Sequence, residues 1–176
     1  IAIGCIALTN TSGLCNTAVG TMAGCTLTTG CNNTFLGYGA IPASATSCNS
    51  ITFGNASITA LRANCTTITA LSDCRDKTDI CGIPIGLGFI RALNPVTFTW
   101  NTRDGSKVGI PDAGFIAQDL DTVQTQFTAT DYLNLILKDN PDQWEATPGK
   151  LIPVLVKAIQ ELAAELDIVK AALNLQ

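Results

Sequence analysis

The chain has 176 residues, of which 47% are hydrophobic and 14% charged, and its formal net charge is −4. This length suits one domain or two small ones, and the low charge without a basic cluster argues against nucleic-acid binding. The absence of histidine excludes His-based catalytic triads and removes the commonest zinc ligand. No apolar run reaches the roughly 20 residues that span a bilayer, so we expect the apolar surface to be buried against other copies of the chain.

Cysteine is frequent, but its spacing matches no common site. The eight cysteines are Cys5, Cys15, Cys25, Cys31, Cys48, Cys65, Cys74 and Cys81. None form a C-x-x-C pair, so the usual zinc and redox spacings are absent. Nothing else in the sequence indicates an oxidising compartment. We therefore expect reduced cysteines acting as small hydrophobic residues, with disulfides or interchain pairing as the alternative, and no metal or cofactor.

Residues 1–60 contain a repeat. In each unit two residues, mostly apolar, precede a glycine, and the glycines, which lie 16, 17 and 17 residues apart, are Gly4, Gly20, Gly37 and Gly54. A unit of this size forms one or two short strands and a turn, and it must stack on the next unit to bury its apolar face. Glycines and asparagines that recur once per unit suit left-handed backbone at fixed corners.

The stacking can be arranged in two ways. The repeats resemble those of trimeric β-prism or β-helical fibre stalks and adhesins, which favours three intertwined chains. Cys15, Cys31 and Cys48, one ahead of each following unit, would then stack as an inward ladder. The alternative is an ordinary β-solenoid formed within one chain.

The repeats are followed by a serine and a lysine, Ser72 and Lys77, that could act together as nucleophile and base. Residues 58–71 alternate apolar and polar residues, which predicts strands leading to them. Ser72 and Lys77 are five residues apart, which places them about 140° apart on a helix and on opposite faces of a strand. They can meet only if the chain turns between them, and serine and aspartate favour turns. From spacing alone, a solvated turn that caps the next element is the simpler interpretation.

The central region predicts a strand and a turn, followed by irregular chain. Residues 95–100 read as a strand because they are β-branched and aromatic. Asp104–Gly105 marks a turn, and residues 114–120 are either a strand end or a helix start. Residues 121–150 are polar and irregular in pattern, with turns at residues 140–142 and 148–149.

The C-terminal segment predicts a long helix with Pro153 in its first turn, where a missing N–H is harmless. Apolar residues recur in steps of 3 and 4: Ile152, Leu155, Ile159, Leu162, Leu166, Val169 and Leu173. This is a heptad seam, which favours self-association and permits a trimer. The alternative is an amphipathic helix that packs on the core of its own domain.

Four motifs, in order, resemble the endosialidase-type intramolecular chaperone domain found at the C-terminus of phage tailspikes and tail fibres. They are residues 72–77, 92–100, 114–120 and 158–162. The resemblance covers roughly residues 72–176. It implies a domain that trimerises the chain, helps a β-rich stalk to fold, and then cuts itself off between Leu71 and Ser72 with Ser72 and Lys77 as the catalytic pair. It also implies a helix near residues 82–90, which the glycines there weaken, and an arm within residues 121–150 that grips the stalk.

The implied chemistry is intramolecular. The Ser72 hydroxyl can reach the Leu71 carbonyl through a five-membered ring, giving an ester that water opens; direct attack followed by hydrolysis is the same chemistry in outline. A serine needs a base, and Lys77 can serve only as the neutral amine, which burial or a nearby cation favours. Arg75 is the neighbouring cation that could tune Lys77, unless it pairs with Asp73 or Asp76. The oxyanion donor is not assigned by the sequence.

Together these patterns predict an α+β chain with three parts. Residues 1–71 are expected to be the end of a fibre stalk, built as an intertwined trimeric β-repeat. Residues 72–150 are expected to form a mixed α/β chaperone and self-cleavage domain, and residues 151–176 a trimeric coiled-coil helix. The expected partners are two further copies and the chain's own stalk, with no nucleic acid or membrane. We expect the chaperone to act in the host cytoplasm during assembly and the stalk to remain in the virion fibre. The alternatives are a structural fibre tip that does not cleave and, less favoured because no carboxylate pair stands out, a carbohydrate-cleaving enzyme.

Overall fold

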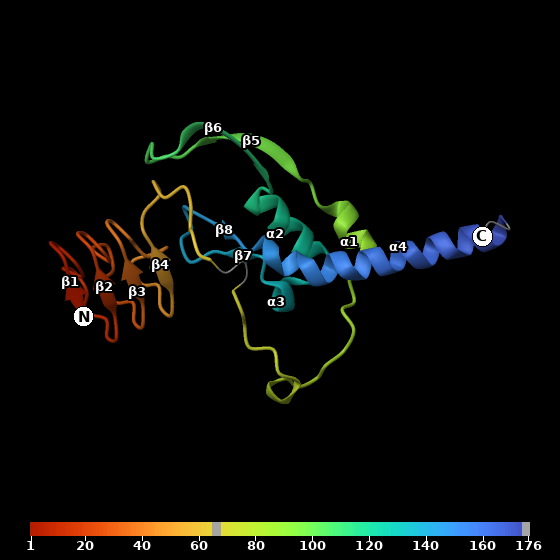
Figure 1. The fold of residues 1–176 in the computed structure, drawn as a ribbon, viewed down its shortest axis with the longest axis horizontal. Helices are drawn as coiled ribbons and strands as arrows, with labels where there is room; N and C mark the ends of the chain where they lie inside the picture. Colours follow the sequence, from red (N-terminus) through yellow and green to blue (C-terminus); the bar gives the residue numbers. More distant parts are fainter. Residues whose placement is uncertain (65–67, 174–176) are drawn as a thin grey trace. The chain divides into compact units, whose positions relative to one another are not determined.

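A computed structural model describes residues 1–64 and 68–173. The chain is mixed α/β and ends in a long helix, as the sequence predicted (Figure 1). It divides into two compact units. One unit contains Ile1–Arg62, Thr99–Asp112 and Lys138–Trp144, and the other contains the remaining described segments.

The repeats form a parallel stack within one chain (Figure 1). Its strands, which pair in chain order, are β1 (Ala2–Ile3), β2 (Thr17–Val19), β3 (Thr34–Leu36) and β4 (Ile51–Phe53). Equivalent residues of successive repeats lie opposite one another: Ala18 pairs with Phe35, and Phe35 pairs with Thr52. The prediction of intertwined chains is wrong for these strands, and the single-chain solenoid is what the structure shows.

The solenoid interior is apolar and contains a ladder of asparagine amides. Ala18, Leu27 and Phe35 are fully buried there. The Asn33 amide nitrogen donates to Asn16 Oδ1 at 3.1 Å, and the Asn16 amide donates to a backbone carbonyl at 2.9 Å. Because each amide binds the neighbouring coil, these buried polar groups are satisfied without water.

The corners of the solenoid use left-handed backbone, as the recurring glycines and asparagines predicted. Gly20 has φ +135°, and Asn32 and Asn49 have φ +56° and +59°. A Cβ atom added to Gly20 would lie 2.5 Å from the Gly37 carbonyl oxygen of the next coil. Glycine is therefore required at this corner both by conformation and by the close approach of the coils.

The cysteine row follows the stack but faces outward. Cys48 Sγ accepts a hydrogen bond from the Cys31 N–H at 3.0 Å, and Cys31 Sγ accepts one from the Leu14 N–H at 3.3 Å. Cys15 and Cys48 are exposed and Cys31 is half-buried. The predicted inward ladder is wrong, because asparagines and apolar side chains occupy the interior. The described cysteines are free, and Cys65 lies outside the described residues.

The strands predicted at residues 58–71 are not present in the described part of that segment, 58–64 and 68–71. Leu61, Ile68 and Leu71 are exposed. Alternation supplies strand propensity, but a strand also needs a neighbour that completes its ladder, and these residues pair with none of the described strands. The rest of this prediction, residues 65–67, lies outside the described residues.

The segment from residue 72 onward is built from short elements and one long helix. These are the 3-10 turn η1 (Cys74–Asp76), α1 (Leu87–Ala92), β5 (Val96–Asn101), β6 (Val108–Gly114), α2 (Ala117–Gln126), α3 (Thr130–Leu133), β7 (Ile136–Leu137), β8 (Glu145–Ala146), the 3-10 turn η2 (Pro148–Leu151) and α4 (Ile152–Ala172). The strand at 95–100 and the turn at Asp104–Gly105, where Gly105 has φ +70°, are confirmed. Residues 114–120 hold both a strand end and a helix start. The prediction that residues 121–150 are irregular is wrong, because helices and a small sheet form there.

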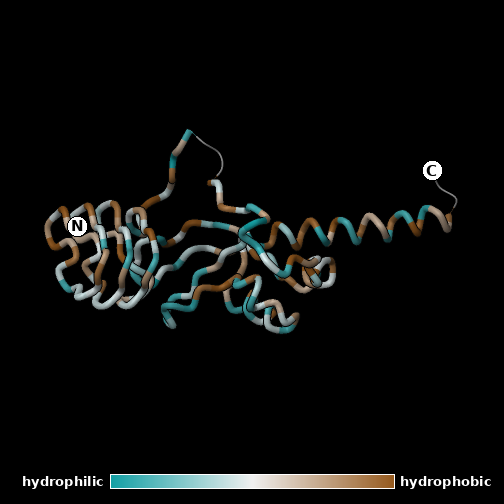
Figure 2. Tube along the Cα trace, turned by 90° about the horizontal axis from the view of Figure 1, so that it is seen from below, coloured by the Kyte–Doolittle hydropathy of each residue, from teal (hydrophilic) through white to brown (hydrophobic). Residues whose placement is uncertain are grey.

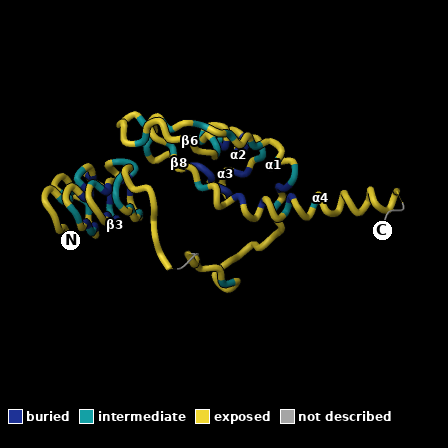
Figure 3. Tube along the Cα trace, turned by 45° about the horizontal axis from the view of Figure 1, so that its top comes forward, coloured by how far each residue is buried: buried dark blue, intermediate teal, exposed yellow. Residues whose placement is uncertain are grey.

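The second unit has its own core around α1, α2 and α4 (Figure 3). Phe89, Leu120 and Val154 are almost completely buried. The rings of Phe89 and Phe127 meet edge to face with centroids 5.3 Å apart, a favourable aromatic arrangement. This contact ties the short helix α1 to the end of α2, although glycines weaken the intrinsic helicity of α1.

Helix α4 begins near Pro153 as predicted, and its contacts with its own unit leave the heptad seam exposed. Val154 and Ala158 are the buried residues of the helix. The seven seam residues, from Ile152 to Leu173, are between 43% and 65% exposed. Figure 3 shows most of α4 as exposed, and Figure 2 shows apolar and polar residues alternating along it. Contacts with the core of its own unit therefore do not explain why apolar residues recur along this face of α4.

Within the described residues, no helix has the length and apolar character needed to cross a membrane.

Candidate active site

The turn at residues 72–77 is shaped by its own capping interactions. Asp73 caps η1, since its Oδ1 accepts the Arg75 backbone N–H at 2.9 Å. The Lys77 backbone N–H closes the turn at 3.2 Å onto a carbonyl at its start. This short aspartate-capped turn reverses the chain between Ser72 and Lys77, which is the condition that their spacing imposed.

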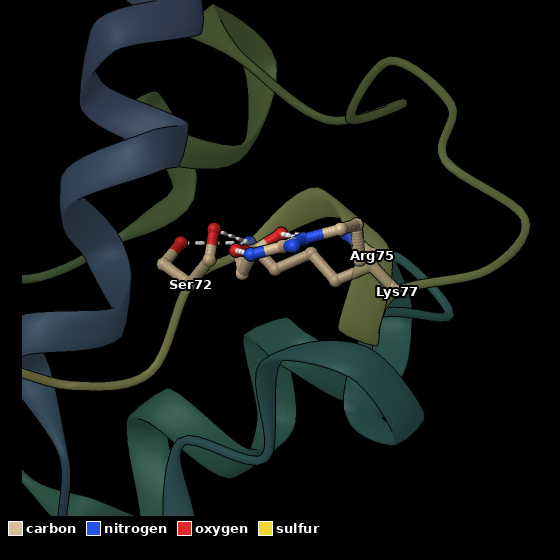
Figure 4. A network of polar contacts seen from close by, with 4 residues as sticks. Ser72, Arg75 and Lys77 are labelled. Atoms are coloured by element: carbon tan, nitrogen blue, oxygen red, sulfur yellow. Dashed lines mark hydrogen bonds and ion pairs between the residues drawn. The ribbon is translucent and has the colours of Figure 1, made fainter.

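The reversal brings the two predicted site residues into contact (Figure 4). Lys77 Nζ lies 2.7 Å from Ser72 Oγ and 3.3 Å from the Ser72 carbonyl oxygen. A charged amine donates to the hydroxyl at this distance, whereas a neutral amine can accept the hydroxyl proton. Leu71, the residue on the other side of the predicted cleavage bond, is exposed, as are Ser72 and Lys77.

Arg75 is engaged with Asp73. Its guanidinium donates from Nε and from a terminal nitrogen to the two Asp73 oxygens at 3.0 and 2.6 Å. These bonds hold the pKa of the Asp73 carboxyl below its usual range. Pairing with Asp73 was one of the alternatives that the sequence left open, and it leaves less of the Arg75 charge free to act on Lys77.

A contact that the sequence did not reveal links α1 to α4. Glu161 Oε2 accepts the backbone N–H of Leu87, the first residue of α1, at 2.7 Å. A Cβ atom on Gly86 would lie 2.3 Å from the same oxygen, so glycine makes room for the carboxylate. Glu161 thus satisfies an orphan N–H at the helix start, and its charge suits that end of the helix.

The described residues contain no group of His, Cys, Asp and Glu side chains that could hold a metal ion. The chemistry available at the turn is that of a hydroxyl, an amine and the adjacent peptide bond. This set corresponds to a serine nucleophile with a lysine base, for which the required contact is a hydrogen bond between the two side chains.

Residues 72–129 match the family described as chaperone of endosialidase. The match begins at Ser72 and covers η1, α1, the β5–β6 hairpin and α2. It supports a chaperone domain in this segment, and the family is classed as a peptidase, which is consistent with self-cleavage. The repeats and α4 lie outside the match. No curated protein and no solved structure matches the chain.

Proposed function

We propose that the segment from Ser72 onward is a C-terminal intramolecular chaperone. It trimerises the chain, helps the stalk of a viral tail fibre or tailspike to fold, and releases itself by autoproteolysis between Leu71 and Ser72. The observation that carries this proposal is the 2.7 Å contact between Lys77 Nζ and Ser72 Oγ, in a segment whose family match starts at Ser72. The chaperone acts in the host cytoplasm during assembly, and the stalk remains in the virion.

The proposed reaction is a single self-cleavage. Neutral Lys77 Nζ takes the proton of the Ser72 hydroxyl, and Ser72 Oγ attacks the Leu71 carbonyl carbon. The bond from that carbon to the Ser72 nitrogen breaks, the nitrogen receives the proton, and an ester joins Leu71 to Ser72 Oγ. Water then hydrolyses the ester to a Leu71 carboxylate and a free Ser72 hydroxyl. Nucleophile and carbonyl belong to adjacent residues, so proximity supplies much of the rate.

Assembly would control the timing of this reaction. Ser72 and Lys77 are exposed to water in the single chain. A neighbouring subunit that covers the turn would remove water from Lys77 and favour its neutral form. Cleavage would then follow trimer formation and report that it has occurred.

The exposed seam of α4 supports the trimer. Its residues repeat in heptads and stay 43–65% exposed, while Lys157 and Glu161, off the seam, form an ion pair at 3.4 Å. A seam with mixed isoleucine and leucine permits three helices to pack in parallel. In this arrangement α4 of each copy buries its apolar stripe against the other two.

The test is the intact mass of the purified, denatured chain. We expect two fragments that meet at Leu71 and Ser72 in the wild type, and one uncut mass in Ser72→Ala and in Lys77→Ala. Thr78→Ala, which removes an exposed hydroxyl next to Lys77, is the matched control and should cut like the wild type. An uncut wild-type chain that is nevertheless trimeric by native mass would refute autoproteolysis.

Solvent exposure of the Ser72–Lys77 pair favours one alternative of a different class. In that alternative the turn stays hydrated even in the assembly, the chain is not cut, and residues 72–173 serve as a structural trimeric fibre tip. The two proposals share the trimer and differ only in processing, so the same mass measurement separates them.

A further inference from the structure

One outward row of the solenoid is entirely apolar. At the last position of each strand lie Ile3, Val19, Leu36 and Phe53, which we call the apolar ridge. Adjacent members are direct partners in the parallel register. Their exposed fractions are 59%, 38%, 37% and 57%. The ridge therefore runs without interruption along all four coils.

The ridge is not part of the core of its own chain. Side chains alternate between the two faces of a strand. Ala18 and Phe35, between the outward positions, are fully buried and form the core with residues of the turns. The ridge residues point the other way. Ile51, in the neighbouring outward row, is also 65% exposed, which widens the apolar face.

The chemistry of the surroundings restricts what can cover this face. Residues 1–61 contain no Asp, Glu, Lys or Arg, so this stretch has no formal side-chain charge to pair with a charged protein, a nucleic acid or an anionic membrane. A contiguous exposed apolar row marks an interaction surface in a chain that remains in solution. The occupant must be apolar, and it must present side chains along the full length of the stack.

A second copy of the solenoid meets both conditions. Ridge residues recur once per coil, at the spacing of about 4.8 Å between neighbouring strands. A copy that runs parallel has the same spacing, so every coil can place an apolar side chain against the partner. An α-helix rises by about 5.4 Å per turn. Its side chains would therefore not stay aligned with successive ridge residues along the stack.

We propose that the apolar ridge packs against the ridges of the other copies in the trimer, so that the stalk consists of three single-chain solenoids lying side by side. This inference rests on the proposed function in one respect, which is that the α4 seam holds the copies parallel. It assigns to the stalk an interface of its own, separate from α4, that persists after residues 72–176 are released.

The experiment is photo-crosslinking in the full chain, made uncleavable by Ser72→Ala. The variants Val19→p-benzoylphenylalanine and Leu36→p-benzoylphenylalanine place a photoreactive group on the ridge. Thr29→p-benzoylphenylalanine places it on an exposed residue of the same coil as Val19 but outside the strands. Native mass establishes the number of chains in each variant before irradiation.

Covalent dimers and trimers from the Val19 and Leu36 variants, with the Thr29 variant remaining monomeric on a denaturing gel, are the expected result. If the chain is trimeric by native mass but the ridge variants give no crosslinked copies, or the Thr29 variant gives as many, the ridge is not the interface. An adduct with another protein in place of a second copy would also overturn the inference. Because cleavage is disabled, failure of autoproteolysis does not affect this result, and a monomeric native mass would reveal failure of the trimer itself.

Discussion

Glu161 connects the long helix to the start of α1 through one carboxylate. Its pKa lies below the usual value because it accepts the Leu87 N–H, with a smaller contribution from Lys157. A carboxyl with a lowered pKa stabilises the folded state above its unfolded pKa of about 4.3. That stabilisation disappears as pH falls through the lower, folded value.

The pH dependence of unfolding tests this contact. In the Ser72→Ala background, we expect Glu161→Gln to lower the thermal midpoint at neutral pH and to reduce its fall on acidification below about pH 4.3. Glu165→Gln, one turn further along the exposed part of α4, is the control and should keep the wild-type profile. Parallel pH profiles for the Glu161 variant and the wild type would show that the carboxylate does not stabilise the fold.

Single residues also mark how far the site could be predicted. The spacing of Ser72 and Lys77 set a local condition, a turn, and η1 meets it. The Glu161–Leu87 contact joins residues 74 positions apart, and no periodicity or motif connects them. Gly86 is the one local signal, because a glycine allows another group to approach the backbone closely. A glycine cannot indicate that the approaching group is the Glu161 carboxylate.

At the scale of elements, the asparagine ladder makes the coils of the solenoid depend on one another. The Asn33 amide nitrogen donates to Asn16 Oδ1 and to the Ser47 carbonyl at 3.1 and 2.8 Å, and its oxygen accepts the Ser50 N–H at 3.1 Å. Asn33 is fully buried. Removing its side chain would take this partner from the Ser47 carbonyl and the Ser50 N–H of the next coil, whereas Asn16 Oδ1 would keep the Asn33 backbone N–H at 3.0 Å.

We therefore expect Asn33→Ala to destabilise the repeat unit by about 1–3 kcal/mol for each buried group left without a partner. Hydrogen exchange of the β2 and β3 amides should accelerate accordingly. Thr29→Ala, at an exposed position three residues before the corner residue Asn32, should leave exchange close to that of the wild type. Equal exchange rates in the two variants would mean that the amide ladder does not hold the coils together.

Elements with a local period were the predictable ones. The heptad helix, the strand at residues 95–100 and the stacking of the repeats all follow from patterns within a few turns or one repeat. A 17-residue period does not say which chain supplies the next coil, so the intertwined stalk was wrong. Cysteine and asparagine recur with the same period, and periodicity alone could not decide that asparagine points inward. Residues 58–71 alternate apolar and polar side chains as a strand does, but among the described residues no strand pairs with them.

For the whole molecule, the proposed order of events is assembly, then cleavage, then release. Once residues 72–176 have left, a stalk that needed their help to fold has no route to refold after unfolding. Its lifetime is then governed by the rate of unfolding rather than by an equilibrium. The apolar ridge would contribute to that lifetime because it remains in the released stalk.

The link between assembly and cleavage can be tested on the seam. Leu155 and Ile159 are 43% and 65% exposed in the single chain, so an aspartate there costs the isolated fold little but places a charge in the helical interface of a trimer. We expect Leu155→Asp and Ile159→Asp to be monomeric by native mass and to stay uncut, although Ser72 and Lys77 are intact. Ala164→Asp adds the same charge off the seam and should assemble and cut normally.

Concentration gives an independent measure of the same link. If only the trimer cuts, dilution of freshly folded wild-type chain should slow cleavage until it matches the seam variants, and the cut fraction should follow the trimer fraction. The relevant comparison is the mass of denatured samples taken at equal times across the dilution series. A seam variant that is monomeric and yet cuts as fast as the wild type would show that the turn is active by itself, and that burial of Lys77 by a neighbouring subunit is not required.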